Sequence, residues 1–257
     1  MSDTPTDALP FVAPCRRLPL AAPWRWLRLG WHDVRAAPGT SLAYGLGIVA
    51  LSAAVSAIGW HYGSGWMLLV LLSSFIFVAP VLAIGLYAIS AQLARGERPS
   101  LRRCLFEERR HLGDTLVYSL ILMVICLVWV RAGSGIQIFY PESGQPTRAE
   151  LLTFFAIGSA VGSIFALVAF AASAFSLPML LDRRTDGVTA VVTSINAVLR
   201  NKATMAVWVA IIVAAVALGF ATAFLGLAVT MPLIGHATWH AYRETIDASA
   251  WPACGPD

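Results

Sequence analysis

Long apolar runs alternate with short polar segments along this chain. The last run, Ala203 to Gly235, contains no charged side chain. A helix that is apolar on every side must be buried on every side, and a run of this length is typical of membrane segments. A tight turn near Gly219 or Gly226 would let the run cross a bilayer twice. The alternative is one very long, kinked helix.

The whole pattern predicts an all-α fold, a polytopic transmembrane helical bundle of about six spans, or five if the last run is a single helix. Thr147 and Glu150 have the spacing of a capping box, which marks the start of the fourth span. The expected spans are Ser41–Trp60, Trp66–Leu93, Thr115–Val130, Thr147–Leu181 and a pair that divides Ala203–Arg243.

Three amphipathic segments precede the expected hairpins. They are Trp24–Arg35, Leu101–Leu112 and Asp186–Arg200, and Asp186 has the chemistry of a helix N-cap. In the first segment, apolar residues recur at helical spacing beside a basic flank. This pattern predicts interfacial helices that lie along the cytoplasmic membrane surface.

Composition supports a membrane protein. Of 257 residues, 58% are hydrophobic and 12% are charged, whereas a soluble domain carries about 25% charged residues. We expect one transmembrane domain over residues 16–245, a disordered N-terminal tail over 1–15 and a C-terminal tail over 246–257. The net charge of +4 does not indicate nucleic acid, because the basic residues follow the membrane topology.

The basic residues gather before the first span, after the second and fourth spans, and after the last. A six-span topology places all of these segments on one side, which the positive-inside rule assigns to the cytoplasm. We therefore expect a multi-pass membrane protein with both termini in the cytoplasm.

Few side chains carry candidate chemistry. No Asp, Glu, Lys or Arg lies in the middle of an expected span, which argues against a proton-driven carrier. His236 and His240 are four residues apart, so they share a helix face and could bind a metal ion with a third ligand from elsewhere. The alternative is a pair of interfacial histidines in an aromatic belt with Trp239 and Tyr242.

Other residues are expected to shape the bundle or to contact lipid. Three prolines are expected to kink the second, fourth and sixth spans: Pro80, Pro178 and Pro232. The residues expected at the lipid interface are Trp24, Arg25, Arg28, Trp31, Arg35, Arg102, Arg103, Trp239, Tyr242 and Arg243.

Several stretches resemble a family of bacterial polytopic membrane proteins of unknown function, whose members sometimes carry the label of cytochrome c oxidase subunits. These stretches are Gly30–Asp33, Phe175–Arg183, Val198–Asn201 and Pro232–Arg243. The resemblance implies an inner-membrane protein of about six spans and supplies no activity. A haem–copper catalytic subunit needs more histidines deep in its helices than the five that this chain contains.

The sequence shows no phosphate-binding glycine loop, nucleophile elbow or pair of catalytic carboxylates. We therefore expect a non-enzymatic accessory, scaffold or assembly protein without a cofactor. Its expected partners are membrane lipids and another inner-membrane complex. The alternatives are a transporter of small solutes or lipids, and a metal-binding respiratory component that uses His236 and His240.

Overall fold

The computed structural model describes residues 10–62, 78–100, 112–136 and 147–254. Within these ranges every regular element is a helix, and two isolated antiparallel bridges join the chain ends to the body. The main helices are α1 (Ala22–Ala36), α2 (Pro38–Tyr62), α4 (Ile84–Ala94), α6 (Leu112–Ile136), α7 (Arg148–Ser173), α8 (Ser176–Asp182), α9 (Gly187–Arg200), α10 (Lys202–Ala221) and α11 (Leu227–Thr245).

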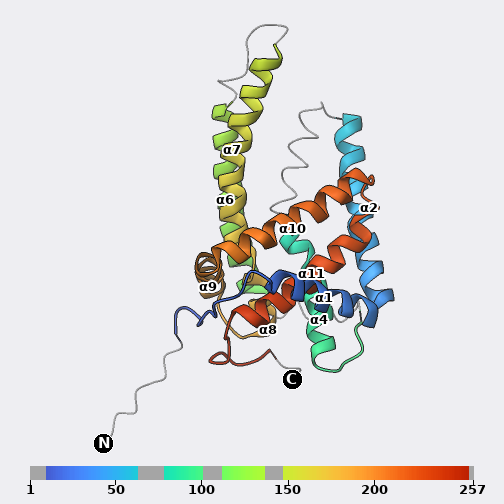
Figure 1. The fold of residues 1–257 in the computed structure, drawn as a ribbon, viewed down its shortest axis with the longest axis vertical. Coiled ribbons are helices and arrows are strands. Elements are labelled where there is room, and N and C mark those ends of the chain that lie inside the picture. The colour runs from blue at the N-terminus through green and yellow to red at the C-terminus, as the bar shows by residue number, and fades with distance from the viewer. Residues whose placement is uncertain (1–9, 63–77, 101–111, 137–146, 255–257) are drawn as a thin grey trace, which may run out of the picture.

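The helices form a base from which a long hairpin projects (Figure 1). The α6–α7 hairpin and α2 extend in the same direction, whereas α1, α4 and α8 lie at the opposite end. Four described helices are long and apolar enough to cross a membrane: Pro38–His61, Leu116–Gly135, Arg148–Asp182 and Lys202–Ala221. The expected all-α membrane architecture is confirmed.

The number of candidate spans is four among the described residues, against about six expected. The second expected span lies partly outside the described residues, and its described part forms the shorter apolar helix Val78–Ala94. The last expected span corresponds to α11, whose C-terminal half carries His, Thr, Arg and Glu side chains. These polar residues lower its hydropathy below that of a typical span.

The last apolar run folds as a hairpin of α10 and α11 and not as one long helix. The connecting turn places Ala223 at φ 50° and Phe224 at φ 69°. Thr222 Oγ1 accepts a hydrogen bond of 2.8 Å from the Gly226 amide, which stabilises the turn. The reversal lies at the position that the glycines at 219 and 226 indicated.

Two helix starts have the side-chain caps that the sequence predicts. The Thr147 hydroxyl and the Glu150 carboxylate form a complete capping box at the start of α7. The Asp186 carboxylate accepts a hydrogen bond of 2.9 Å from the Thr189 amide at the start of α9.

The centre of the fold is α11, which packs against α1, α2, α4 and α10. Its closest neighbours approach through glycines. A Cβ on Gly30 of α1 would lie 2.7 Å from the Ala237 amide nitrogen and 2.8 Å from the Leu233 carbonyl oxygen. Only a residue without a side chain lets the α1 backbone come this near to α11.

The three prolines have different local effects. Pro178 lies near the start of α8, and the helix is interrupted just before it, at Ala174 and Phe175, as expected because the proline ring excludes a regular preceding turn. The helix that contains Pro80 is interrupted at Ala83. Pro232 lies inside α11, which continues through it.

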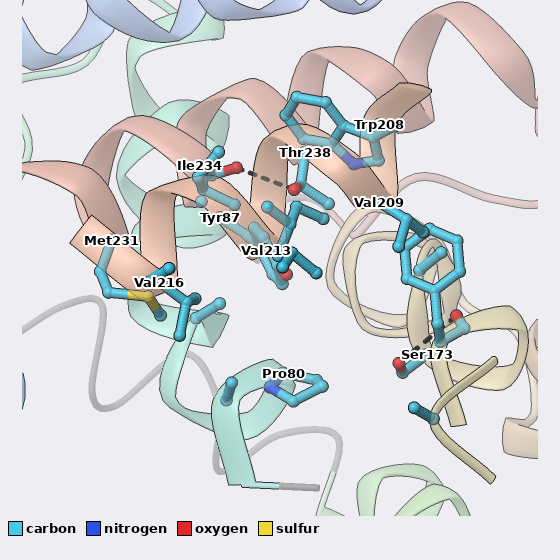
Figure 2. Close-up of a pocket in the computed structure, with 18 of the residues that line it drawn as sticks. Pro80, Tyr87, Ser173, Trp208, Val209, Val213, Val216, Met231, Ile234 and Thr238 are labelled. Atoms are coloured by element: carbon cyan, nitrogen blue, oxygen red, sulfur yellow. Dashed lines mark hydrogen bonds between the residues drawn. The ribbon is translucent and has the colours of Figure 1, made fainter. Parts of the chain in front are cut away.

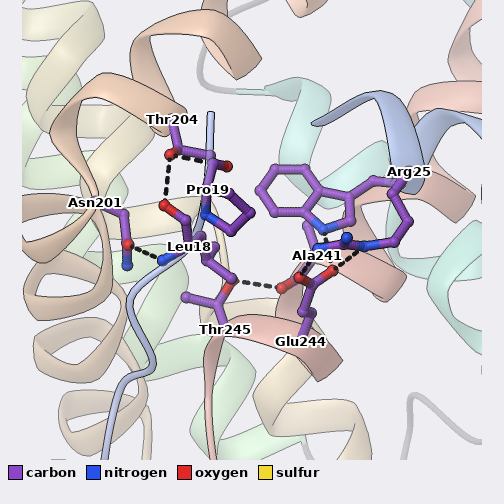
Figure 3. Close-up of polar contacts among 9 residues, drawn as sticks. Leu18, Pro19, Arg25, Asn201, Thr204, Ala241, Glu244 and Thr245 are labelled. Carbon is purple, nitrogen blue, oxygen red and sulfur yellow. Dashed lines mark hydrogen bonds and ion pairs between the residues drawn. The ribbon is translucent and has the colours of Figure 1, made fainter. Parts of the chain in front are cut away.

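The described segments that precede α1 and follow α11 contact the base. The Leu18 amide donates to Asn201 Oδ1 over 2.9 Å, and Thr204 Oγ1 donates to the Leu18 carbonyl (Figure 3). Ala13 and Cys15 are buried, although they belong to the stretch that we expected to be a disordered tail, whereas Phe11 is exposed. The expected C-terminal tail is also packed as far as Cys254, with Trp251 buried.

Candidate functional site

A cluster of hydrogen-bonded polar side chains lies between α1, α2, α4 and α11. It consists of Asp33, Ser41, Ser90, His236 and His240, which we call the polar cluster. His236 is 0% exposed, and Asp33, Ser41 and Ser90 are also buried. The consecutive helices α1 and α2 therefore meet α4 and the distant α11 at one set of polar groups.

The hydrogen bonds of the polar cluster run in one direction, toward the Asp33 carboxylate. Ser90 Oγ donates to Asp33 Oδ2 over 2.7 Å, so its oxygen is free to accept from His236 Nδ1, also at 2.7 Å. His236 Nε2 then accepts from Ser41 Oγ at 3.0 Å. A neutral His236 with its proton on Nδ1 satisfies the contacts with both serines.

His240 reaches the same carboxylate from the side that is partly exposed to solvent. Its Nε2 lies 2.9 Å from Asp33 Oδ2, and its side chain is 23% exposed. Burial raises the pKa of the Asp33 carboxyl, but hydrogen bonds from His240 and Ser90 outweigh it and hold that pKa below its usual value. Asp33 is therefore an ionised acceptor at neutral pH.

This arrangement differs from the alternative of two interfacial histidines in an aromatic belt. Both contact Asp33 or its hydrogen-bond network, and His236 is fully enclosed. Both ring nitrogens of His236 already face serine hydroxyls. Across the described ranges no group of three or more His, Cys, Asp or Glu side chains is arranged to hold a metal ion, and metal binding by the pair stays a prediction.

The residues expected at the lipid interface divide into exposed and buried groups. Trp24 is 63% exposed and Trp31 is 39% exposed, whereas Trp239 and Tyr242 are 2% and 1% exposed. Trp239 and Tyr242 therefore pack inside the protein and do not form an aromatic belt. The Tyr242 hydroxyl donates to Asp182 Oδ2 over 2.9 Å, and Arg243 pairs with the same carboxylate.

Arg25 also differs from the expectation. Its guanidinium pairs with Glu244 of α11 (Figure 3), and the same carboxylate accepts a hydrogen bond of 2.9 Å from Trp26 Nε1. Arg28 and Arg35 are exposed, as expected. Arg102 and Arg103, and the amphipathic segment that contains them, lie outside the described residues.

A second candidate site is an apolar cavity of about 450 Å³. Its walls come from α10, α11, α7 and the segment around Pro80 (Figure 2). The lining residue Val213 is 61% exposed, so the cavity reaches the outer surface of the bundle. It is lined by Ala79, Pro80, Ala83, Tyr87, Ala166, Phe170, Ser173, Ala174, Trp208, Val209, Ile212, Val213, Val216, Ala217, Phe220, Met231, Ile234, Gly235 and Thr238.

The cavity wall offers little polarity. None of the described residues that line the cavity is charged. Ser173 Oγ donates to the Ala169 carbonyl over 2.7 Å, and Thr238 Oγ1 donates to the Ile234 carbonyl over 2.8 Å. Because these hydroxyl protons are used within their own helices (Figure 2), the cavity suits an apolar molecule.

The three proline sites adjoin this cavity. Pro80 lines it, Ala174 at the interruption before Pro178 lines it, and Met231 beside Pro232 lines it. The sequence predicted the prolines as kinks but gave no indication that they surround one space.

Asp33, Ser41 and Ser90 were not predicted from the sequence as members of one site. A signal for the inward face of α1 was present, because Ala22, Trp26, Gly30 and Asp33 recur at helical spacing and all are buried. A carboxylate on the same face as buried small and aromatic residues indicates a buried polar contact.

Comparison with known proteins gives a family without an assigned activity. Residues 67–182 match the model of a family described as a predicted integral membrane protein, DUF2189. This match confirms the resemblance to an uncharacterised membrane family, and the chain is an integral membrane protein with several apolar helices. No curated protein and no solved structure was found to match it.

The matched region contains α4, α6, α7 and α8 but ends before α10 and α11. It therefore includes Ser90 and two walls of the cavity. Asp33, His236 and His240 lie outside it.

Proposed function

We propose that this integral membrane protein binds the hydrocarbon chain of a membrane lipid in the apolar cavity. The observation that carries the proposal is the cavity of about 450 Å³ with an uncharged lining. Ligand pockets in proteins have volumes of roughly 300–1,000 Å³, so the space is sufficient for a specific ligand.

The position of the cavity favours a lipid over a polar solute. Two of its walls, α7 and α10, belong to candidate membrane spans. A lipid chain can enter sideways from the bilayer past Val213, whereas a polar solute would lose its hydration without gaining hydrogen bonds. Of the two transport alternatives that the sequence left open, the lipid alternative therefore has support.

Kinked helices around the cavity support lipid handling as well as static binding. Interrupted helices have fewer internal hydrogen bonds and can change direction at small cost. The accessory or scaffold role stays a prediction beside this proposal, because a protein that binds lipid can also assist a neighbouring complex.

We place the protein in the bacterial inner membrane, with both termini in the cytoplasm. The positive-inside rule supports this orientation, since the arginines at positions 95, 183, 184 and 243 lie on the segments expected to share one side. Single cysteines introduced at Arg200 and Arg148 test it in cells. An impermeant maleimide should label position 148 from outside and leave position 200 unlabelled until the membrane is permeabilised.

The lipid proposal is tested by photo-crosslinking. The purified full chain is placed in bilayer nanodiscs that contain phosphatidylcholine with a diazirine near the end of one acyl chain. We expect crosslinks concentrated on residues 208–220 and 231–238 after irradiation. Labelling spread evenly over the exposed apolar faces of α2 and α6 would mean that the cavity has no preferred ligand.

A matched pair of variants gives the control. Ala217 lines the cavity and its neighbour Leu218 does not, although both are exposed on α10. Ala217→Trp should fill the cavity and reduce crosslinking of its lining several-fold, whereas Leu218→Trp should leave it unchanged. An equal effect of both variants would contradict the proposal.

A further inference from the structure

The outer face of α1 carries alternating aromatic and basic side chains. Trp24, Arg28, Trp31 and Arg35 are separated by four, three and four residues, so they form one stripe along the helix. All four are exposed. We call this set the tryptophan–arginine stripe.

The stripe lies opposite the face by which α1 packs on the protein. The buried residues of α1 include Trp26, Gly30 and Asp33, which lie about half a helical turn away from the stripe. Because α1 is anchored by this inner face, the stripe is held outward by the fold. It is not needed to attach α1 to α11.

The arginines of the stripe are free of acidic partners within the described residues. Arg25, on the flank of the helix, is neutralised by Glu244. Arg28 and Arg35 have no comparable ion pair in the described part of the chain, and the Arg35 guanidinium lies 5.2 Å from the centre of the Trp31 ring. This stacking holds a positive charge beside an exposed aromatic ring.

The geometry points to an anionic phospholipid headgroup as the occupant of the tryptophan–arginine stripe. Exposed tryptophans favour the depth of the headgroups in a bilayer, and guanidinium groups bind phosphate through paired hydrogen bonds. In Figure 1, α1 runs crosswise to α6 and α7, which is the orientation of a helix lying along the membrane surface when those helices cross it. The stripe binds the headgroup layer of the leaflet beneath α1.

The inference is independent of the apolar cavity, since no residue of the stripe lines the cavity. The test uses the purified full chain in nanodiscs of phosphatidylcholine with increasing phosphatidylglycerol. After transfer to detergent, native mass spectrometry measures the number of phosphatidylglycerol molecules retained. We expect the wild-type protein to retain phosphatidylglycerol in preference to phosphatidylcholine.

The double variant Arg28→Gln with Arg35→Gln should lower this preference by about fivefold for each arginine removed. The control, Arg131→Gln with Arg148→Gln, removes the same net charge from exposed positions on α6 and α7 and should retain the wild-type preference. Unchanged retention in the first variant, or equal loss in both, overturns the inference.

A second measurement separates lipid contact from a folding defect. Brominated phosphatidylglycerol should quench the fluorescence of Trp24 and Trp31, measured as the difference between the wild-type protein and a Trp24→Phe, Trp31→Phe variant. The cavity variant Ala217→Trp should retain both the phosphatidylglycerol preference and the quenching. Absence of quenching in the folded wild-type protein would show that the stripe does not lie among headgroups.

Discussion

Gly45 of α2 lies directly against the carbonyl oxygen of Ala228 in α11, so closely that a Cβ at position 45 would collide with it. Pro232 is four residues after Ala228 and has no amide proton to donate to this carbonyl. The Ala228 carbonyl oxygen therefore lacks the amide donor that a residue other than proline would supply. Gly45 covers this oxygen at a depth where water is scarce.

This contact predicts a difference between two glycines of one helix. Gly45→Ala should lower the free energy of unfolding by about 1–3 kcal/mol, because the added methyl group forces α2 away from α11. Gly47 faces open space, so Gly47→Ala should be neutral or stabilise by at most about 1 kcal/mol. Thermal unfolding in detergent, followed by circular dichroism, compares the two. Equal melting temperatures would show that α2 and α11 can separate without cost.

The polar cluster predicts that His236 contributes to stability and His32 does not. Replacing His236 by Leu leaves the Ser41 and Ser90 hydroxyls without their ring partners in a buried site, which should cost about 1–3 kcal/mol. The His32 side chain is 80% exposed, and His32→Leu is the matched control. Chemical denaturation in mixed micelles measures both, and a larger loss for His32→Leu would contradict the role assigned to the cluster.

Loss of the Glu244 carboxylate should lower the free energy of unfolding more than loss of the Arg25 guanidinium that it pairs with. Glu244→Ala removes the acceptor of the buried Trp26 indole N–H, and we expect a loss of about 1–3 kcal/mol. Arg25→Ala removes a partly exposed ion pair but leaves the indole hydrogen bond intact, and should cost less than about 1 kcal/mol. The Trp26 ring makes a T-shaped contact with Trp208, with ring centroids 5.4 Å apart. The intrinsic fluorescence of the protein should therefore shift only in the Glu244 variant. The reverse order of the two losses would contradict this assignment.

Asp186 should give the protein a dependence on acid pH. Burial raises the pKa of this carboxyl, but hydrogen bonds from Thr189 outweigh it and hold the pKa below its usual value of 3.8. The stabilisation is therefore present above that value and is lost as the pH falls through the lower pKa of the folded protein. As the pH is lowered from 6 to 3, the unfolding midpoint of the wild-type protein should fall. The midpoint of Asp186→Asn should fall less steeply, because asparagine keeps an acceptor but cannot titrate.

The variant Asp186→Ala provides the second half of this test. It should lose about 1 kcal/mol at pH 7, because the Thr189 amide loses its cap. Its midpoint should then fall less steeply over the acid range than that of the wild-type protein, and the remaining slope comes from other carboxyls such as Asp33. A wild-type midpoint that is independent of pH there would show that the Asp186 cap contributes no stability.

Local features of the fold could be predicted from the sequence because they depend on neighbouring residues. The capping box of Thr147 and Glu150, the cap at Asp186 and the reversal near Gly226 each follow from spacing within a few positions. The polar cluster could not be predicted in this way. The contact of Asp33 with His240 joins residues separated by 207 positions, and no local pattern specifies which distant helix meets α1.

The faces of helices were harder to assign than the helices themselves. Trp24 and Trp26 differ by two positions and have the same chemistry, yet the first is exposed and the second is fully buried. Trp239 and Tyr242 have the composition of an interfacial belt, but packing against α1 and the base encloses them. In a membrane protein both lipid and protein interior accept apolar side chains, so hydrophobicity alone does not distinguish the two surroundings.

The contacts between α1 and α11 determine when, during synthesis, the polar cluster can form. Synthesis delivers Asp33, Ser41 and Ser90 before His236 and His240, so Ser90 can donate to Asp33 early, whereas Ser41 must wait for α11 to supply its ring partner. Until then the Ser41 hydroxyl lacks the imidazole of His236 and Asp33 lacks the imidazole of His240, and quality-control proteases can recognise such an unfinished chain. The arrival of α11 is thus the step that completes the polar cluster.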